Sequence, residues 1–448
     1  MIQPSTTATT LGLATRLKWE LFRLLEKLND LRAGASESQL TLPPGKPTAA
    51  LWVFVSTIGE LNAIDPLLKA IVARNGHLQL VLLSDRLHYR EIYISRYPQA
   101  IVANINGHST EALQLCDRYP PELLVVAEIP CWPGDAPCRF PFAFVYEAKR
   151  HGARAIVVNG WLYHYPPSCR MDSVERSLFQ CDYLSLFDTI AVQTDEVRQY
   201  MLAAGAQAER LKVTGNIKFD ALPSQGWSPE GARSSIMLSS LIASGRRSVV
   251  CGCVTDRAEQ EMILDGYHRL RKTHPDVLLI LAPRHPEYAE RIQELRELLE
   301  QKGIAAWFRS TQEDSPVPDG IAALVLDTIG ELRDFYAAAT ITHVGKDHNV
   351  LEPLGFNKPV TVGPDWEATY PSYPVYRLLL DAECLLEVND AEQLAQKWLD
   401  MFDSGQHYQE MQQRISTAIA QAKGAVARHL ELIEPMFKTP AMKDGRRA

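Results

Sequence analysis

Residues 342–359 read THVGKDHNVLEPLGFNKP, and this stretch decides the fold of the second half of the chain. Residues 341–344 are typical of a short strand, Gly345 of a turn, and residues 350–356 of the first turns of a helix. Such a strand, turn and helix start leave unpaired backbone N–H groups and a partial positive charge directed at one place. The stretch therefore predicts an α/β unit that holds an anion, such as a phosphate, at its turn.

Polar side chains follow this turn. We expect His348 and Asn349 at its mouth and Glu352 about one helical turn further along the same face. A carboxylate in that place can accept hydrogen bonds from the vicinal hydroxyls of a sugar. The alternative is that Asn349 only caps the helix and that Glu352 only favours its first turn. The stretch by itself leaves both interpretations open.

The composition describes a globular protein with two domains of ordinary size. The chain has 448 residues, of which 46% are hydrophobic and 22% are charged. A net charge of -8 and the lack of a dense Lys/Arg cluster argue against nucleic acid as a partner. Only Cys251 and Cys253 of the eight cysteines are close in sequence, which is a poor zinc signal. We expect no bound metal, and reduced cysteines in a cytoplasmic protein.

The N-terminal region predicts one amphipathic helix. Residues 1–10 are polar and do not resemble a signal peptide. The sequence contains no uninterrupted run of about 18 apolar residues, which is the length needed to span a bilayer. Residues 11–32 carry leucines at helical spacing beside Trp19 and Phe22, and basic residues outnumber acidic ones. This helix either lies on an anionic membrane surface or packs on the body of the protein. Residues 33–49, rich in Ser, Gly and Pro, are typical of a linker.

Strands and helices alternate from residue 49 onward, which is typical of parallel sheets covered on both faces. The first series of strands is expected at 50–55, 78–83, 100–103, 123–126, 155–158 and 189–193, separated by helical stretches that include 111–117, 144–151, 172–180 and 195–204. The second series is expected at 248–253, 277–282, 322–326, 341–344 and 359–362.

We therefore predict an α/β architecture of two doubly wound, Rossmann-like domains that face each other across a cleft. The predicted division is an N-terminal helix and linker (1–47), a first domain (48–222), a connection (223–247), a second domain (248–425) and a tail (426–448). In such sheets, ligands bind beyond the carboxyl ends of the strands.

That rule selects four loops, which are the turn at 345–349, TIGE at 57–60, PRHP at 283–286 and DTIGEL at 327–332. Three of the four lie in the second half, so one phosphate-bearing ligand is expected there. Glu60 is expected to face it from the first domain.

The order of six motifs resembles the 3-deoxy-D-manno-octulosonic acid (Kdo) transferases. They are TIGE (57–60), VTGNIKFD (213–220), LAPRHPE (281–287), DTIGEL (327–332), FYAAA (335–339) and HNVLEP (348–353), and the match covers roughly residues 48–425. The resemblance implies an inverting glycosyltransferase of the GT-B fold with CMP-Kdo as donor. It also implies a glycolipid acceptor, the lipid A precursor, at the cytoplasmic face of the inner membrane, without a metal or other cofactor.

The resemblance also assigns roles to individual residues. Glu60 aligns with the family's general base, which takes the proton of the acceptor hydroxyl, and inversion needs a single displacement. Arg284 neutralises the departing CMP phosphate. The remaining donor-side residues are His285 beside Arg284, backbone groups of Ile329, Gly330 and Glu331, and Lys346, His348, Asn349 and Glu352 around phosphate and ribose. The acceptor-side residues are Gly59, Glu128, Trp132 and Asn159.

Several departures from the family pattern lie on the acceptor side. The E-x-E-x-W-P element keeps Glu128 and Trp132 but has Pro130 for its second glutamate, and the N-A-R-x-S segment after Asn159 lacks its arginine. The glycine-rich loop before His348 is also shortened, where Lys346 can supply a donor.

These departures keep two alternatives open, a CMP-sugar-acid transferase with a different, soluble acceptor and a non-catalytic relative that binds a nucleotide. Retention of Glu60 and Glu352 speaks against the second.

Overall fold

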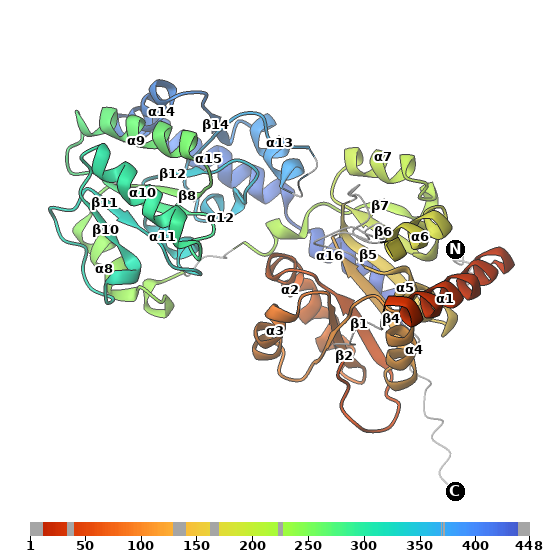
Figure 1. Cartoon of the computed structure of the whole chain (residues 1–448). Coiled ribbons are helices and arrows are strands. Elements are labelled where there is room, and N and C mark those ends of the chain that lie inside the picture. Colours follow the sequence, from red (N-terminus) through yellow and green to blue (C-terminus); the bar gives the residue numbers. More distant parts are fainter. Residues whose placement is uncertain are drawn as a thin grey trace, which may run out of the picture. The chain divides into compact units, whose positions relative to one another are not determined.

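Two parallel sheets of seven strands each form the framework of the chain (Figure 1). The computed structural model describes residues 12–33, 40–128, 140–161, 170–222, 227–368, 370 and 372–437. The chain divides into two units. The first holds the described residues up to Ala221 and again from Lys423 onward, and the second holds those from Leu222 to Ala422.

The sheet of the first unit has the strand order β3-β2-β1-β4-β5-β6-β7. Its strands are β1 (Ala50–Phe54), β2 (Gln79–Ser84), β3 (Ile101–Asn104), β4 (Pro121–Ala127), β5 (Arg154–Gly160), β6 (Thr189–Val192) and β7 (Leu211–Val213). The order reverses between β1 and β4, so the edge where these two strands end is the topological switch point at which such sheets bind ligands.

Helices cover both faces of this sheet because its strands are apolar on both sides. Trp52 and Phe54 of β1 point into one core, with α4 (Ser109–Arg118), α5 (Phe142–Arg150), α6 (Arg170–Phe179) and α7 (Asp195–Ala203). Leu51 and Val53 point into the other, with α2 (Ile58–Arg74), α3 (Arg90–Arg96) and α16 (Ala425–Ile433). The described part of segment 426–448, expected as a tail, thus contributes α16 to the core of the first unit.

Helix α1 (Leu13–Ala33) packs on this unit through one face only. Trp19 and Phe22 are buried, and the Trp19 ring lies 6.0 Å from that of Phe142. The Trp19 indole also donates to Glu147 Oε1 at 3.0 Å. The opposite face exposes a row of leucines, namely Leu13, Leu17, Leu21, Leu24, Leu28 and Leu31. Packing on the protein, one of the two alternatives for residues 11–32, is confirmed, and it leaves the leucine face uncovered within the described residues.

The sheet of the second unit has the order β10-β11-β9-β8-β12-β13-β14. Its strands are β8 (Ser248–Val254), β9 (Leu278–Pro283), β10 (Ala306–Phe308), β11 (Ala323–Val325), β12 (Ile341–Val344), β13 (Val360–Val362) and β14 (Leu385–Glu387). The order reverses between β8 and β12, which places the second switch point beside residues 342–359.

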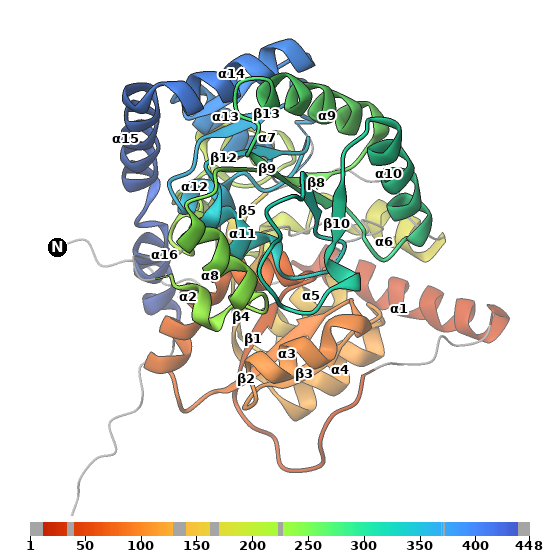
Figure 2. The same ribbon diagram turned by 90° about the vertical axis from the view of Figure 1, so that its left-hand side faces the viewer.

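The helices of the second unit lie on both faces of its sheet (Figure 2). One face carries α9 (Arg257–Arg271), α10 (Ala289–Gln301) and α14 (Ala391–Asp403). The other carries α8 (Ser235–Ser244), α11 (Leu332–Ala338) and α12 (Leu351–Gly355). Helices α13 (Tyr373–Asp381) and α15 (Gly405–Ala422) complete the unit. Helix α8 lies within the predicted connection 223–247 and belongs to this unit.

Candidate functional site

Glu60 lies at the switch point of the first sheet, in the first turn of α2. Thr57 caps this helix by accepting from the Glu60 backbone N–H at 3.2 Å. The Glu60 carboxylate in turn accepts from the Ser56 N–H at 2.7 Å and from the Thr57 hydroxyl at 3.3 Å. The residue is 4% exposed. A reciprocal capping arrangement therefore fixes the direction of this carboxylate, and Gly59 precedes it in the same turn.

Glu128 follows β4 on the other side of the same switch point. It is 3% exposed and has a positive φ of 57°. Its carboxylate accepts from the Lys218 ammonium at 2.7 Å and from the Asn159 amide at 3.0 Å. Glu128 is thus buried and paired. Its partner Lys218 comes from the VTGNIKFD segment, and the sequence did not predict this pairing.

Asn159 is fully buried and holds other groups in place. The Asn159 side-chain NH₂ donates to Glu128, and its side-chain oxygen accepts from the Ile217 N–H at 2.9 Å. The Asn159 backbone N–H donates to His429 Nε2 at 3.2 Å. The residue therefore acts through its neighbours rather than at a surface. Trp132, the remaining acceptor-side prediction, lies outside the described residues.

In the second unit, the turn after β12 is built around Gly345. A Cβ at this position would lie 2.2 Å from the Cys253 carbonyl oxygen, so only glycine fits. The His348 N–H donates to the Gly345 carbonyl at 3.3 Å, and Asp347 takes a positive φ of 66°. The Asp347 carboxylate accepts from the Glu367 N–H at 2.8 Å. Asp347 thus adopts the left-handed conformation for which glycine is usual.

Glu259 of α9 holds this turn against β8. Its carboxylate contacts His343 Nε2 at 3.3 Å and accepts from the backbone N–H groups of Thr255, at 3.3 Å, and Lys346. Burial alone raises the pKa of Glu259, but the contacts with His343 and these N–H groups hold it below its usual value. An ionised carboxylate therefore positions the Lys346 backbone.

His348, Asn349 and Glu352 lie along the start of α12. His348 Nε2 contacts the Thr255 hydroxyl at 3.3 Å, and burial together with the Arg284 charge lowers the His348 pKa to about 4. Asn349 precedes the N-cap residue Val350 and accepts from the Leu351 N–H at 3.1 Å, and its amide lies 3.4 Å from Glu352. Burial raises the pKa of Glu352. Because its pKa is lowered to about 4, His348 is neutral at pH 7.

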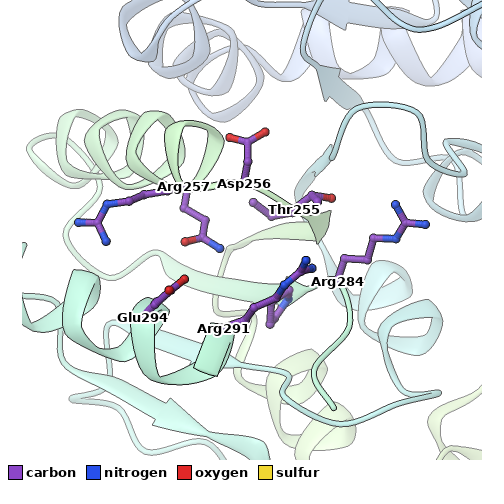
Figure 3. Close-up of a pocket in the computed structure, with 9 residues that line it drawn as sticks. Thr255, Asp256, Arg257, Arg284, Arg291 and Glu294 are labelled. Carbon is purple, nitrogen blue, oxygen red and sulfur yellow. The ribbon is translucent and has the colours of Figure 1, made fainter. Parts of the chain in front are cut away.

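The turn after β9 presents Arg284. Its backbone N–H pairs with the Val254 carbonyl at 3.0 Å, while His285 beside it has a φ of 57° and contacts Glu287 at 3.0 Å. Together with Arg291 of α10, Arg284 lines a pocket at the ends of β8 and β9 (Figure 3). Within the described part of the chain, the Arg284 guanidinium has no hydrogen-bond or ion-pair partner. It is therefore available for an anionic ligand.

The turn after β11 exposes Ile329 and Gly330 but not the Glu331 side chain. Ile329 is 69% exposed, Gly330 has a φ of 93°, and Glu331 is 1% exposed. Burial alone raises the pKa of Glu331, but hydrogen bonds from Ser234 and Thr328 and the Arg309 charge lower it below its usual value. The Glu331 carboxylate thus forms a structural ion pair with Arg309. Only the backbone of Glu331 is left for a nucleotide.

Sequence reasoning missed Glu259 and Arg291. Glu259 follows Asp256 by three residues, and Asp256 caps α9 by accepting from its N–H at 2.8 Å. That D-x-x-E spacing before a helix was a readable signal. Arg291 lies on a helix face and belongs to none of the motifs, so only the fold brings it to the pocket.

The residues that the structure describes contain no group of three or more His, Cys, Asp or Glu side chains placed to hold a metal ion. None of their helices has both the length and the apolar character that a bilayer crossing needs.

Comparison with known proteins adds sequence relatives. A sequence model of the family described as "3-Deoxy-D-manno-octulosonic-acid transferase (kdotransferase)" matches residues 26–221. A 3-deoxy-D-manno-octulosonic acid transferase of Chlamydophila psittaci is 30% identical over 72% of this chain and 70% of its own. Those of Bordetella pertussis and Haemophilus influenzae are 27% and 25% identical, over 93% and 88% of this chain and 92% and 88% of theirs.

Solved structures support the predicted fold. A glycosyltransferase from Rickettsia africae superposes with a TM-score of 0.56 at 11% identity, covering 87% of this chain and 98% of its own. UDP-GlcNAc 2-epimerase from Neisseria meningitidis, bound to UDP-GlcNAc, gives 0.54 at 14% identity, covering 86% and 100%. Together with the two seven-stranded parallel sheets, these likenesses confirm an α/β GT-B fold.

Proposed function

This chain belongs to the 3-deoxy-D-manno-octulosonic acid transferase family, and from that membership we propose that it transfers Kdo from CMP-Kdo to a lipid A precursor with Glu60 as general base. Family membership makes the chain a glycosyltransferase whose relatives transfer Kdo. The acceptor, the base and the donor contacts are our proposals.

The observation that carries the role of Glu60 is its place in the fold. Its carboxylate is fixed at the carboxyl end of β1, where the strand order reverses. A sugar hydroxyl is a weak nucleophile, and a carboxylate within hydrogen-bond reach can take its proton as the anomeric carbon is attacked. A side chain that is already oriented loses little freedom when the acceptor binds.

The reaction is a single displacement at C2 of Kdo. The bond from C2 to the acceptor oxygen forms as the bond from C2 to the phosphate oxygen breaks, and CMP leaves with the electron pair. The hydroxyl proton passes to Glu60, and the configuration at C2 inverts. Arg284 stabilises the negative charge that grows on the CMP phosphate.

The donor nucleotide is assigned to the carboxyl ends of β11 and β12. Backbone groups of Ile329 and Gly330 contact the base, and Lys346 and Asn349 contact phosphate. Glu352 accepts from the ribose hydroxyls. Neutral His348 beside Thr255 can donate or accept a hydrogen bond without adding charge. These roles agree with the exposure of the turn residues and with the buried, structural role of the Glu331 carboxylate.

Helix α1 supports an acceptor that resides in a membrane. At about 100° per residue, its buried face with Trp19 and Phe22 points away from the exposed leucine row. Basic side chains flank that row, namely Arg16 and Lys27 on one side and Arg32 on the other. Lys18, next to Arg32 on the same side, is instead paired with Asp182 at 2.8 Å. A leucine face with basic borders suits an anionic bilayer surface. We therefore place the protein peripherally on the cytoplasmic face of the inner membrane.

Glu60→Gln tests the base, because glutamine keeps one oxygen to accept from the Ser56 N–H and loses the basicity. Glu111 provides a matched control, since it caps α4 in the same unit through the N–H groups of Asn106 and His108 at 2.8 and 3.3 Å. We expect E60Q to retain its melting temperature and CMP binding but to lose at least a hundredfold in Kdo transfer, within the range typical of a lost general base. E111Q should keep its activity.

Three results would overturn parts of this proposal. Unchanged turnover of E60Q removes Glu60 as the base. Transfer to a soluble acceptor but not to a tetra-acylated disaccharide lipid replaces the acceptor. Binding of CMP-Kdo without transfer to any acceptor by the wild-type chain indicates a non-catalytic relative.

A further inference from the structure

We propose that the pocket at the ends of β8 and β9 holds the sugar-acid ring of the donor and that Arg291 binds its carboxylate. The inference rests on the proposed function, because it assigns one part of the donor site. It names the contact by which this site would select a sugar acid over a neutral sugar.

The pocket is formed by the ends of two central strands and the starts of the helices that follow them. Val254 and Pro283 come from the strand ends, Thr255 and Asp256 from the start of α9, and Arg284 and Arg291 lie on the connection to α10 and in its first turn. Figure 3 shows Arg291 and Glu294 on α10 below Asp256, while the side chains of Arg257 and Arg284 extend to opposite sides. The pocket therefore borders the turn that carries Arg284 and, through Thr255, contacts His348.

Two arginines that line the pocket form no ion pair in the described structure. Within the described residues, neither Arg284 nor Arg291 has a hydrogen-bond or ion-pair partner for its guanidinium, and Arg291 only stacks over the Tyr288 ring at 5.4 Å. Arg257, on the same rim, is instead paired with Glu261 at 2.8 Å. Two unpaired guanidinium groups in one pocket favour a ligand with two negative charges.

The acidic residues of the pocket do not cancel this preference. Asp256 is engaged in capping α9, where it accepts from the Glu259 N–H at 2.8 Å. Glu294 lies one turn beyond Arg291 on α10, is exposed, and forms no ion pair with it in the described structure. An incoming anion thus meets the two arginines at the β9 side of the pocket.

The size of the pocket suits a monosaccharide. Its volume is about 230 Å³, which is below the roughly 300–1,000 Å³ of sites that enclose drug-sized ligands. A whole CMP-sugar does not fit, so the nucleotide must lie outside it. The exposed groups at Ile329, Gly330 and Asn349 are the candidates for that part.

The chemistry of the donor matches two neighbouring cations. C2 of Kdo carries its carboxylate and also the oxygen that links it to the CMP phosphate, so the two anionic groups are separated by a single carbon. If Arg284 binds the phosphate, Arg291 is the other unpaired guanidinium that lines the pocket, and we assign the carboxylate to it. Arginine suits this role because its planar fork can hold both carboxylate oxygens, which a lysine ammonium does not do.

The test compares two ligands on the full chain by titration calorimetry, CMP and freshly prepared CMP-Kdo, with wild type, Arg291→Ala, Arg291→Lys and Arg377→Ala. Arg377 is the control because it is paired with Asp381 on α13, outside the pocket. We expect R291A to bind CMP within twofold of wild type but CMP-Kdo at least tenfold more weakly. R291K should recover only part of the loss, and R377A should bind both ligands like wild type. In transfer assays, R291A should raise KM for CMP-Kdo more than it lowers kcat.

The outcomes separate the inference from the proposed function. If wild type binds CMP-Kdo more tightly than CMP and R291A keeps that difference, the assignment of Arg291 is wrong while the proposed function stands. If wild type binds CMP-Kdo no better than CMP, no sugar subsite exists and the inference is also wrong. If wild type neither binds CMP-Kdo nor transfers Kdo, the proposed function itself fails.

Discussion

Glu60 and Glu111 are residues of the same type in the same local setting with different expected roles. Each caps a helix of the first unit, α2 in one case and α4 in the other. Glu60 follows β1, at the reversal of the strand order, whereas Glu111 follows β3 at the edge of the sheet. Capping by itself therefore does not distinguish a structural carboxylate from a catalytic one, and our proposal of Glu60 as the base rests on its position in the sheet.

Backbone strain marks the same edges of both sheets. Eight non-glycine residues in the described structure have positive φ, and six of them lie at or within three residues beyond the carboxyl ends of strands, namely Glu128, Asn159, Cys253, His285, Asp347 and Asp365. Positive φ costs free energy for a residue with a Cβ and is held only where the surroundings demand it. Its concentration here agrees with two functional edges, one in each unit.

Arg284 gives a prediction about the donor at the scale of one residue. Arg284→Ala should weaken CMP binding about 10- to 100-fold, or roughly 1.4–2.8 kcal/mol, because it removes a charge-assisted contact with phosphate. Arg377→Ala is the control, since Arg377 is paired with Asp381 on the surface of α13. Titration calorimetry with CMP measures both variants. Equal CMP affinity of R284A and wild type would remove Arg284 from the phosphate site.

Helix α1 is the element that we propose to dock on the membrane that holds the acceptor. Replacing Leu17, Leu24 and Leu28 by glutamine should release the protein from anionic vesicles in a flotation assay. These leucines are 65%, 55% and 44% exposed, so the change should leave folding intact. Each leucine inserted into the bilayer contributes roughly 1.5–3 kcal/mol.

Two exposed isoleucines provide a control for this experiment. Ile236 and Ile242 of α8 are 52% and 49% exposed, and their replacement by glutamine should not change flotation. If the leucine variant floats as well as wild type, α1 does not dock on the membrane. If both variants lose flotation equally, the effect is one of general surface polarity.

Helix α16 couples the stability of the first unit to pH through His429. This buried imidazole donates from Nδ1 to the Ala425 carbonyl at 2.7 Å and accepts at Nε2 from the Asn159 N–H. Burial lowers its pKa to about 4. Protonation at Nε2 would place a proton against that N–H donor, so the folded state requires neutral His429.

The sign of the pH effect follows from these pKa values. The unfolded chain binds a proton on His429 near pH 6.5 and the folded chain only near pH 4, so in between the unfolded state binds more protons. Stability from this residue is therefore complete above pH 6.5 and falls as the pH is lowered toward 4. Between pH 7 and pH 5 the loss should be roughly 2 kcal/mol.

Hydrogen exchange of β5 and α16 measures this loss directly. The free energy of opening should fall between pH 7 and pH 5 in wild type. It should fall much less in His429→Gln, which lacks the titrating group. The same pH dependence in both proteins would show that other groups are responsible.

At the scale of the whole molecule, the sequence predicted the two sheets but not three of their edge strands. All eleven expected strands are present, since apolar runs between helices are a strong signal. The additional strands β7, β10 and β14 have three residues each and lie at sheet edges. Strands β11 and β13 are equally short but lie inside their sheets, whereas β7, β10 and β14 each pair with one neighbour only.

The site was predictable where it lies in motifs and not where it depends on strand order. Arg284, His348 and Glu352 could be selected because they follow strands in recognisable segments. The contact of Glu259 with His343 could not be predicted, because it requires β8 and β12 to be neighbours in the sheet although about 90 residues separate them in the sequence. The Glu128–Lys218 ion pair has the same origin.

The central claim is that this chain joins Kdo to a lipid A precursor. The most direct measurement is mass spectrometry of the lipid after the purified full chain is incubated with CMP-Kdo and a tetra-acylated disaccharide lipid. The account predicts a product heavier by one or more whole Kdo residues, formed by wild type and E111Q but not by E60Q. An unmodified lipid in the presence of active wild-type protein and intact CMP-Kdo would contradict it.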